Sequence, residues 1–184
     1  MFTVPFYQYK IKNWDVKKQQ LLKICSSIKF EKHTKITEDN LYTDYGNDGH
    51  YKNDVVQILK DEIIKFSNES NYKNLILTDA WFQQYYRSQF HSPHDHGAIG
   101  YSSVTYIKFD KKVHRPTNFI APFTDPIGDK IEFVPDVDEG EIIFFPSIIT
   151  HYVLPTKTNK KRVLLSFNLH IKSESNFGFL GFTK

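Results

Sequence analysis

The chain has 184 residues and a net charge of +3, and 40% of its residues are hydrophobic while 24% are charged. This composition excludes a disordered chain, and the weak charge without a long basic run argues against a nucleic-acid-binding surface. The single cysteine, Cys25, excludes an intramolecular disulfide framework, and no apolar run is long enough to span a membrane. We therefore expect a single cytoplasmic domain, 1–184, with no nucleic-acid or membrane partner; its oligomeric state stays open.

The first part of the chain, residues 1–73, predicts a helical support for the rest of the domain. A short strand is expected near Val4–Ile11, and Asn13 or Asp15 can begin a helix that runs through about Ile28. The apolar residues of this helix fall on one stripe, at Leu21, Leu22, Cys25 and Ile28. Such a stripe is typical of a helix that packs against a core.

A second helix is expected after a polar, turn-rich segment. Residues 31–53 (EKHTKITEDNLYTDYGNDGHYKN) predict a loop, and the helix opens at Asn53 or Asp54. Apolar residues recur along it at helical spacing, at Val55, Ile58, Leu59, Ile63 and Phe66. Both helices are interpreted as scaffold.

From Asn74 onward the apolar period changes to two. Short runs rich in β-branched and aromatic residues succeed one another, namely NLILTDAWFQQYY, SSVTYIKF, KIEFV, EIIFF and RVLLSFNLHI. We expect seven or eight strands over residues 74–172, closed into a sandwich or jelly roll. The connection Lys111–Asp129 is predicted to be irregular, as binding loops often are, and residues 173–184 form a tail.

The stretch SQFHSPHDHGAIG (Ser88–Gly100) concentrates three of the eight histidines of the chain. On an extended chain the spacing of His94 and His96 puts both rings on one face and Asp95 on the other. Neutral imidazole suits iron, zinc, copper and nickel, so the pair indicates half of a metal site. Taken alone the signal is weak, because such pairs also occur on exposed loops.

The stretch GEIIFFPSIITHYVLP supplies a further histidine, His151, and Arg162 comes after it at the start of RVLLSFNLHI. If that run is a strand, Arg162, Ser166 and Asn168 share one face while the opposite face is wholly apolar and must pack on a layer such as the helices. A buried arginine costs several kcal/mol unless an anion or a dense set of hydrogen bonds pairs with it. An anionic small molecule is one such partner, and a structural carboxylate is the other.

These motifs occur in a recognisable order: Trp81, PHDHG, YSSVTYI, GEIIFFPSIITHYVLP and KRVLLSFN. This order resembles that of the iron(II)- and 2-oxoglutarate-dependent oxygenase superfamily, and within it the prolyl-hydroxylase-like proteins. The resemblance is strongest to the small microbial and phage-type members whose first motif is HxH. The resemblance covers roughly Ala80–Leu169. It implies a double-stranded β-helix, a jelly roll of the cupin kind, which matches the strand pattern found independently.

By this resemblance His94, His96 and His151 would be the metal ligands, with His96 where a carboxylate usually stands. Arg162 would bind the distal carboxylate of 2-oxoglutarate, since a guanidinium offers a carboxylate two parallel donors. Further candidates for contacts with the cosubstrate are Tyr106, Ser166 and Asn168. Tyr106 is equally well explained as a core aromatic, and Asp95 replaces His96 as a ligand if the segment is a loop. His91 is a candidate for supporting His94 from behind.

The implied activity is that of an iron(II)-dependent dioxygenase. It would couple the oxidative decarboxylation of 2-oxoglutarate, to succinate and carbon dioxide, with hydroxylation of an unidentified peptide side chain or small molecule. Three neutral imidazoles leave the metal its full charge, which alters its redox balance and favours zinc. One alternative is therefore a three-histidine cupin-type metalloenzyme that does not use 2-oxoglutarate, and another is a non-catalytic β-sandwich binding module.

Overall fold

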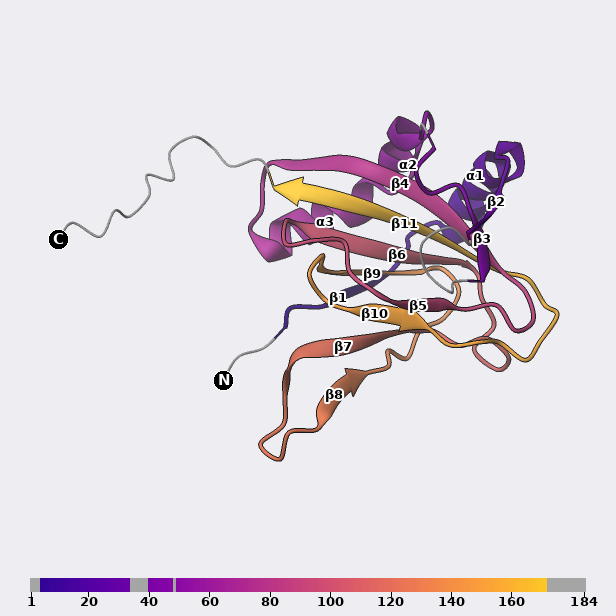
Figure 1. Ribbon diagram of the computed structural model, residues 1–184. Coiled ribbons are helices and arrows are strands. Elements are labelled where there is room, and N and C mark those ends of the chain that lie inside the picture. Colours follow the sequence, from indigo (N-terminus) through magenta and orange to yellow (C-terminus); the bar gives the residue numbers. More distant parts are fainter. Residues whose placement is uncertain (1–3, 34–39, 48, 172–184) are drawn as a thin grey trace.

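The computed structural model describes residues 4–33, 40–47 and 49–171. Two antiparallel sheets form its body, and three helices lie against the larger sheet (Figure 1). Along the chain the elements are β1 (Tyr7–Lys10), α1 (Trp14–Ser27), β2 (Glu31–His33), β3 (Leu41–Thr43), α2 (Lys52–Ile58), α3 (Lys60–Ser70), β4 (Leu75–Tyr85), β5 (His91–His94), β6 (Tyr101–Lys108), β7 (Thr117–Thr124), β8 (Lys130–Phe133), β9 (Glu141–Pro146), β10 (His151–Val153) and β11 (Arg162–Ile171).

The strand order makes this fold a jelly roll. The larger sheet runs β1-β9-β6-β11-β4-β3-β2, and the smaller runs β5-β10-β7-β8. From β4 to β11 the chain passes back and forth between the sheets, so the eight strands wind into a double-stranded β-helix. The predicted fold class and the predicted number of strands are both confirmed. None of the described helices is long and apolar enough to cross a membrane.

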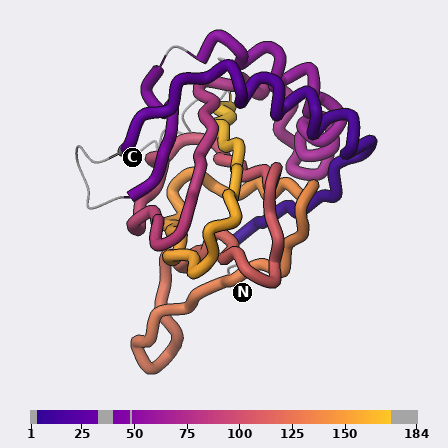
Figure 2. Tube along the Cα trace, turned by 90° about the vertical axis from the view of Figure 1, so that its right-hand side faces the viewer, coloured from indigo at the N-terminus to yellow at the C-terminus, as the bar shows by residue number. Residues whose placement is uncertain are grey.

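The strand β11 explains why the large sheet has one apolar face and one functional face. Val163, Leu165, Phe167 and Leu169 alternate along it and belong to the core cluster that also contains Leu21, Val55 and Phe66 of the three helices. Successive side chains of a strand point to opposite faces, so Arg162, Leu164, Ser166 and Asn168 turn toward the smaller sheet. Figure 2 shows the helices stacked on the outer side of the barrel. The predicted packing of the apolar face on the helices is therefore confirmed.

Three expectations about local structure require correction. Residues 31–53 are not all loop, because β2 and β3 pair with each other and β3 continues the sheet beside β4. The second helix is two helices that meet at Leu59, which is fully buried. The connection Lys111–Asp129 contains β7, whose alternation is interrupted by Pro122 and whose pairing with β10 and β8 supplies the order that the local sequence lacks. The predicted tail, residues 173–184, lies outside the described residues.

The loop that joins β5 to β6 contains two glycines with left-handed backbone angles. Gly97 has a φ of +87° and open space where a Cβ would stand, whereas Gly100 has a φ of +81° and would bring a Cβ to 2.1 Å from the carbonyl oxygen of Leu169. Both positions disfavour any other residue, but only Gly100 also needs the room.

We predict that Gly97→Ala lowers the free energy of unfolding by about 1–2 kcal/mol, the usual strain of a left-handed alanine, and that Gly100→Ala lowers it by about 3 kcal/mol or more because backbone must also move. Urea denaturation of the two metal-free variants measures the difference. Equal losses would show that β11 does not approach the loop as closely as described.

Candidate active site

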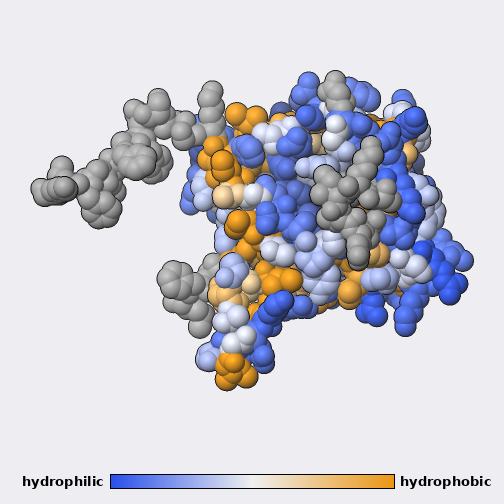
Figure 3. All heavy atoms as spheres, viewed as in Figure 1, coloured by the Kyte–Doolittle hydropathy of each residue, from blue (hydrophilic) through white to orange (hydrophobic). Residues whose placement is uncertain are grey.

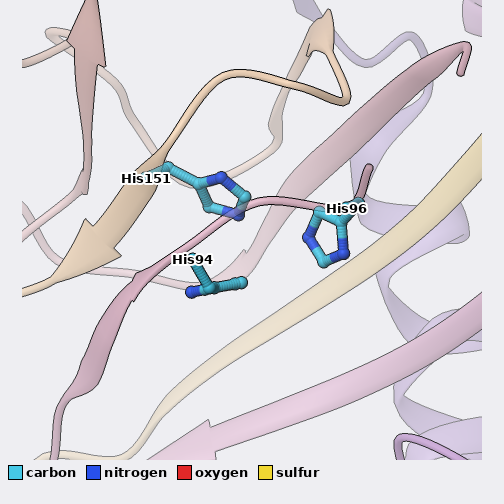
Figure 4. A group of neighbouring side chains, drawn as sticks. All are labelled: His94, His96 and His151. Atoms are coloured by element: carbon cyan, nitrogen blue, oxygen red, sulfur yellow. The ribbon is translucent and has the colours of Figure 1, made fainter. Parts of the chain in front are cut away.

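The three predicted metal ligands come together between the two sheets. His94 ends β5, His151 begins β10, and the two residues are direct partners in the antiparallel register. His96 lies two residues beyond the end of β5. One nitrogen from each ring lies within 4.8 Å of the others, and the rings gather around one space (Figure 4). This arrangement can hold a single metal ion.

Backbone carbonyls orient two of the three rings. Nδ1 of His94 lies 2.7 Å from the carbonyl oxygen of Ser92, and Nδ1 of His151 lies 2.9 Å from that of Ile149. A carbonyl accepts, so each Nδ1 carries the proton and each Nε2 keeps its lone pair. Such outer hydrogen bonds fix the tautomer and the direction of a metal-binding imidazole.

Burial keeps the site electrically neutral before a metal binds. Burial, followed by the neighbouring His94, lowers the pKa of His96 to about 4. Burial, followed by the neighbouring His94 and His96, holds the pKa of His151 well below its usual range. Both rings are therefore neutral at pH 7 and available as nitrogen donors. The donor set suits iron(II) as well as the other divalent metals that imidazole binds.

Asp95 takes no part in this donor set. Its side chain is exposed, and Oδ1 accepts a hydrogen bond of 2.9 Å from the backbone N–H of Gly97. The alternative in which Asp95 replaces His96 is thus not supported, because the chain stays extended enough here to put the two side chains on opposite sides.

Arg162 lies on the same inward side of the large sheet, at the start of β11. It is 1% exposed, its guanidinium lies over the ring of Tyr85 at 4.0 Å from the centroid, and Nη1 donates to the carbonyl of Arg115. Nε and Nη2 are buried without a hydrogen-bond partner among the described residues. Burial lowers the pKa of Arg162 from its ordinary value, but arginine remains charged. No carboxylate is found paired with it in the described part of the chain, so the structural explanation of this arginine is not supported.

Tyr106 is a fully buried residue of β6. Its hydroxyl accepts a hydrogen bond of 3.2 Å from the backbone N–H of Thr117, and burial raises its pKa. Thr117 lines the cavity of the three histidines, together with Tyr85 and Ser166. Ser166 therefore lines the cavity itself, whereas Tyr106 and Arg162 lie behind its wall, in contact with the lining residues Thr117 and Tyr85.

Asn168 is placed differently. It lies toward the other end of β11 from Arg162, and its Oδ1 accepts a hydrogen bond of 2.8 Å from Ser102. Six residues of strand separate it from Arg162, about 20 Å, which is too far for both to hold one small dicarboxylate. We therefore do not retain Asn168 as a contact of the cosubstrate.

His91 and Gln83 complete the wall behind the triad. The ring of His91 stacks on that of His94 with 3.8 Å between centroids, and Nδ1 of His91 lies 3.4 Å from the amide nitrogen of Gln83. Sequence reasoning missed Gln83, Tyr85 and Thr117. The first two alternate with Trp81 on β4, so the period of two could have found them, whereas Thr117 belongs to the segment predicted as irregular.

Residues 79–168 match the model of a family described as "Putative 2OG-Fe(II) oxygenase". This part of the chain belongs to the 2-oxoglutarate- and iron(II)-dependent oxygenase family. The chain is thus an oxygenase that uses iron(II), 2-oxoglutarate and dioxygen, which decides against the binding module and the enzyme without 2-oxoglutarate. No curated protein matches the chain.

Several solved structures share this fold at low sequence identity. A prolyl-4-hydroxylase from Pseudomonas putida is 13% identical with a TM-score of 0.66, over 93% of this chain and 95% of that one. The viral collagen prolyl hydroxylase of Paramecium bursaria Chlorella virus-1, in complex with 2-oxoglutarate, is 13% identical with a TM-score of 0.60, over 91% and 96%. HygX from Streptomyces hygroscopicus, with nickel, 2-oxoglutarate and hygromycin B bound, is 8% identical with a TM-score of 0.64, over 91% and 83%.

The loop that supplies the Arg115 carbonyl to Arg162 is held by a buried histidine. Nδ1 of His114 accepts from the backbone N–H of Asp110 at 3.0 Å, and Nε2 donates to the carbonyl of Lys160 at 2.9 Å. Burial lowers the pKa of His114, because the charged ring would lose its solvation. Protonation of Nδ1 would also set its N–H against that of Asp110. The unfolded chain takes up this proton near pH 6.5, before the folded chain does, so the stability from neutral His114 is lost as the pH falls below about 6.5.

We predict that His114→Gln makes the loss of stability between pH 7.5 and pH 5 shallower than in the unmodified oxygenase. Urea denaturation across this range measures it. The histidines of the triad contribute equally to both proteins, so their effect cancels in the comparison. Identical slopes would contradict the assignment of neutral His114 as the acceptor from Asp110.

Proposed function

We propose that this oxygenase hydroxylates a peptide side chain or a small molecule, with His94, His96 and His151 holding the iron and Arg162 holding 2-oxoglutarate. The observation that carries the proposal is the buried guanidinium of Arg162, which keeps two unbonded donor groups on the same inward side of the sheet as the triad. A dianionic cosubstrate satisfies both the charge and the donors.

The planar guanidinium is suited to the distal carboxylate of 2-oxoglutarate. Nε and Nη2 are adjacent donors that match the two oxygens of a carboxylate, a geometry that lysine cannot offer. Tyr106 and Ser166 are proposed as further polar contacts. Because the site is buried, these charge-assisted hydrogen bonds act in a region of low dielectric constant, where they are stronger than in water.

The remaining wall excludes water and aligns the substrate. Val104, Phe145 and Val153 line the cavity beside the triad and contribute apolar surface. Iron bound by the three histidines would supply the activation of dioxygen, the chemistry for which the protein has no side chain of its own. The overall reaction balances as 2-oxoglutarate, dioxygen and a C–H bond giving succinate, carbon dioxide and a C–OH bond.

Two of the neighbouring structures hold bound molecules of different chemical classes. One is a prolyl hydroxylase from Trichoplax adhaerens in complex with a peptide fragment of hypoxia inducible factor, and HygX is bound to hygromycin B. These molecules are ligands of those proteins, and they support a peptide and a small molecule equally as the substrate class of this chain.

The test is an anaerobic titration of the iron(II)-loaded oxygenase with 2-oxoglutarate, followed by the weak visible charge-transfer band of the complex. We predict a band in the unmodified protein. Arg162→Met, which keeps volume but removes every donor, should weaken 2-oxoglutarate binding by roughly 100-fold, or about 3 kcal/mol, the upper range for hydrogen bonds to a charged group.

The matched control is Arg87→Met, because Arg87 is exposed and its side chain has no proposed role. Its titration should coincide with that of the unmodified protein. A band that forms equally well in Arg162→Met would contradict the role of Arg162, and the absence of a band in an iron-loaded protein would contradict the metal site.

A further inference from the structure

His96 is the one member of the triad that lies outside a strand. His94 and His151 stand on paired strands and direct their rings through hydrogen bonds to nearby carbonyls. The ring of His96 instead contacts other rings, with centroids 5.1 Å from Trp81 and 5.0 Å from His151. An imidazole offers a metal a single lone pair in the ring plane, whereas a carboxylate offers several, so a histidine at this position requires more exact placement.

The backbone around His96 is fixed by the turn that comes after β9. The N–H of His96 donates to the carbonyl of Ser147 at 2.9 Å, and the N–H of Ser147 donates to the carbonyl of Gly100 at 3.1 Å. Ser147 thus bridges both ends of the loop 96–100. Two residues further along the same turn, the carbonyl of Ile149 receives the hydrogen bond from His151. One turn, residues 147–149, therefore bears on two of the three metal ligands.

The side chain of Ser147 ties this turn to the large sheet. Its Oγ lies 3.0 Å from Oγ of Ser102 on β6, and Ser102 in turn donates to Oδ1 of Asn168 on β11 at 2.8 Å. A hydroxyl has one proton, so Ser102, which gives its proton to Asn168, must accept from Ser147. The result is a directed chain from Ser147 through Ser102 to Asn168.

Burial makes this chain rigid. Ser102 and Ser147 are each 1% exposed and Asn168 is 7% exposed, so water does not readily replace a lost partner. Removal of one link leaves a buried polar group unsatisfied, which costs more than the bond itself contributes. The three residues come from segments far apart in the sequence, and the feature that joins them is the turn that faces the triad.

We propose that Ser147, Ser102 and Asn168 are positioning residues that lock the turn 147–149 and so set His96 and His151 in register for one metal ion. The inference rests on the proposed function, in which both histidines are ligands. It also accounts for Asn168, which lies too far from Arg162 to bind the same cosubstrate.

The test is a titration of metal-free protein with Co²⁺, which reports affinity and, through its visible d–d bands, ligand geometry. Ser102→Ala and Asn168→Ala should each weaken Co²⁺ binding roughly 10- to 100-fold and change the bands, the usual effect of disturbing residues that support metal ligands. Ser147→Ala breaks the same chain and replaces Asn168→Ala if that variant does not fold.

Thr156→Val is the matched control. Thr156 is also buried, with 4% of its surface exposed, and its Oγ1 donates one hydrogen bond of 3.2 Å to the carbonyl of Val113. It does not line the cavity of the three histidines, and valine keeps its volume while removing the hydroxyl. The substitution should lower the melting temperature of the metal-free protein, as Ser102→Ala does, while leaving the affinity and the spectrum unchanged.

His96→Ala separates the two levels of the account. If it weakens Co²⁺ binding strongly while Ser102→Ala and Asn168→Ala bind and absorb as Thr156→Val does, the positioning role is wrong and the ligand assignment stands. If His96→Ala leaves Co²⁺ binding unchanged, the ligand assignment of the proposed function fails and the positioning role fails with it.

Discussion

A guanidinium in a protein interior is unfavourable by several kcal/mol unless an opposite charge accompanies it, and Arg162 contacts a tyrosine ring and one backbone carbonyl among the described residues. The arrangement of the site is a consequence of this constraint. A strand that carries such a residue needs strong compensation from its other side chains. In β11 the compensation comes from Val163, Leu165 and Phe167, which alternate with the polar positions and pack under the helices. This packing offsets the free-energy cost of burying Arg162 but does not pair its charge. The guanidinium is therefore available to an anion, whose binding should stabilise the fold.

The same division between faces explains how a chain of this size combines a rigid body with a reactive site. Neighbours on both sides of β11, namely β4 and β6, share its inward face, so residues distant in the sequence meet in one cavity. The smaller sheet supplies two of the three proposed metal ligands, His94 from β5 and His151 from β10. Figure 3 shows apolar side chains at the hairpin β7–β8 and also on the adjoining surface of the body, whereas other parts of the same view are hydrophilic. The site thus lies where the two sheets face each other and depends on both.

Much of this could be predicted from the sequence because its signals are local. The period of two in RVLLSFNLHI predicted both faces of β11, and the positions of His94, His96 and His151 in one family pattern indicated that they meet in one site. What could not be predicted depends on distant contacts. The short strands β2 and β3 form because β3 pairs with the edge of β4. The strand β7 forms despite Pro122 because it pairs with β10 on one side and β8 on the other. The proposed role of Asn168 could not be predicted from the sequence either. Strand alternation gives the face on which Asn168 lies but not its distance from the cavity or its hydrogen bond to Ser102.

The central claim is that one cavity holds a metal on three histidines and a dicarboxylate on Arg162. A crystal structure of the oxygenase with Mn²⁺ and 2-oxoglutarate, grown without oxygen, tests it most directly. The account predicts Mn²⁺ bound by His94, His96 and His151, and the distal carboxylate of 2-oxoglutarate on Nε and Nη2 of Arg162. A metal that takes Asp95 in place of His96, or a carboxylate bound away from Arg162, would contradict it.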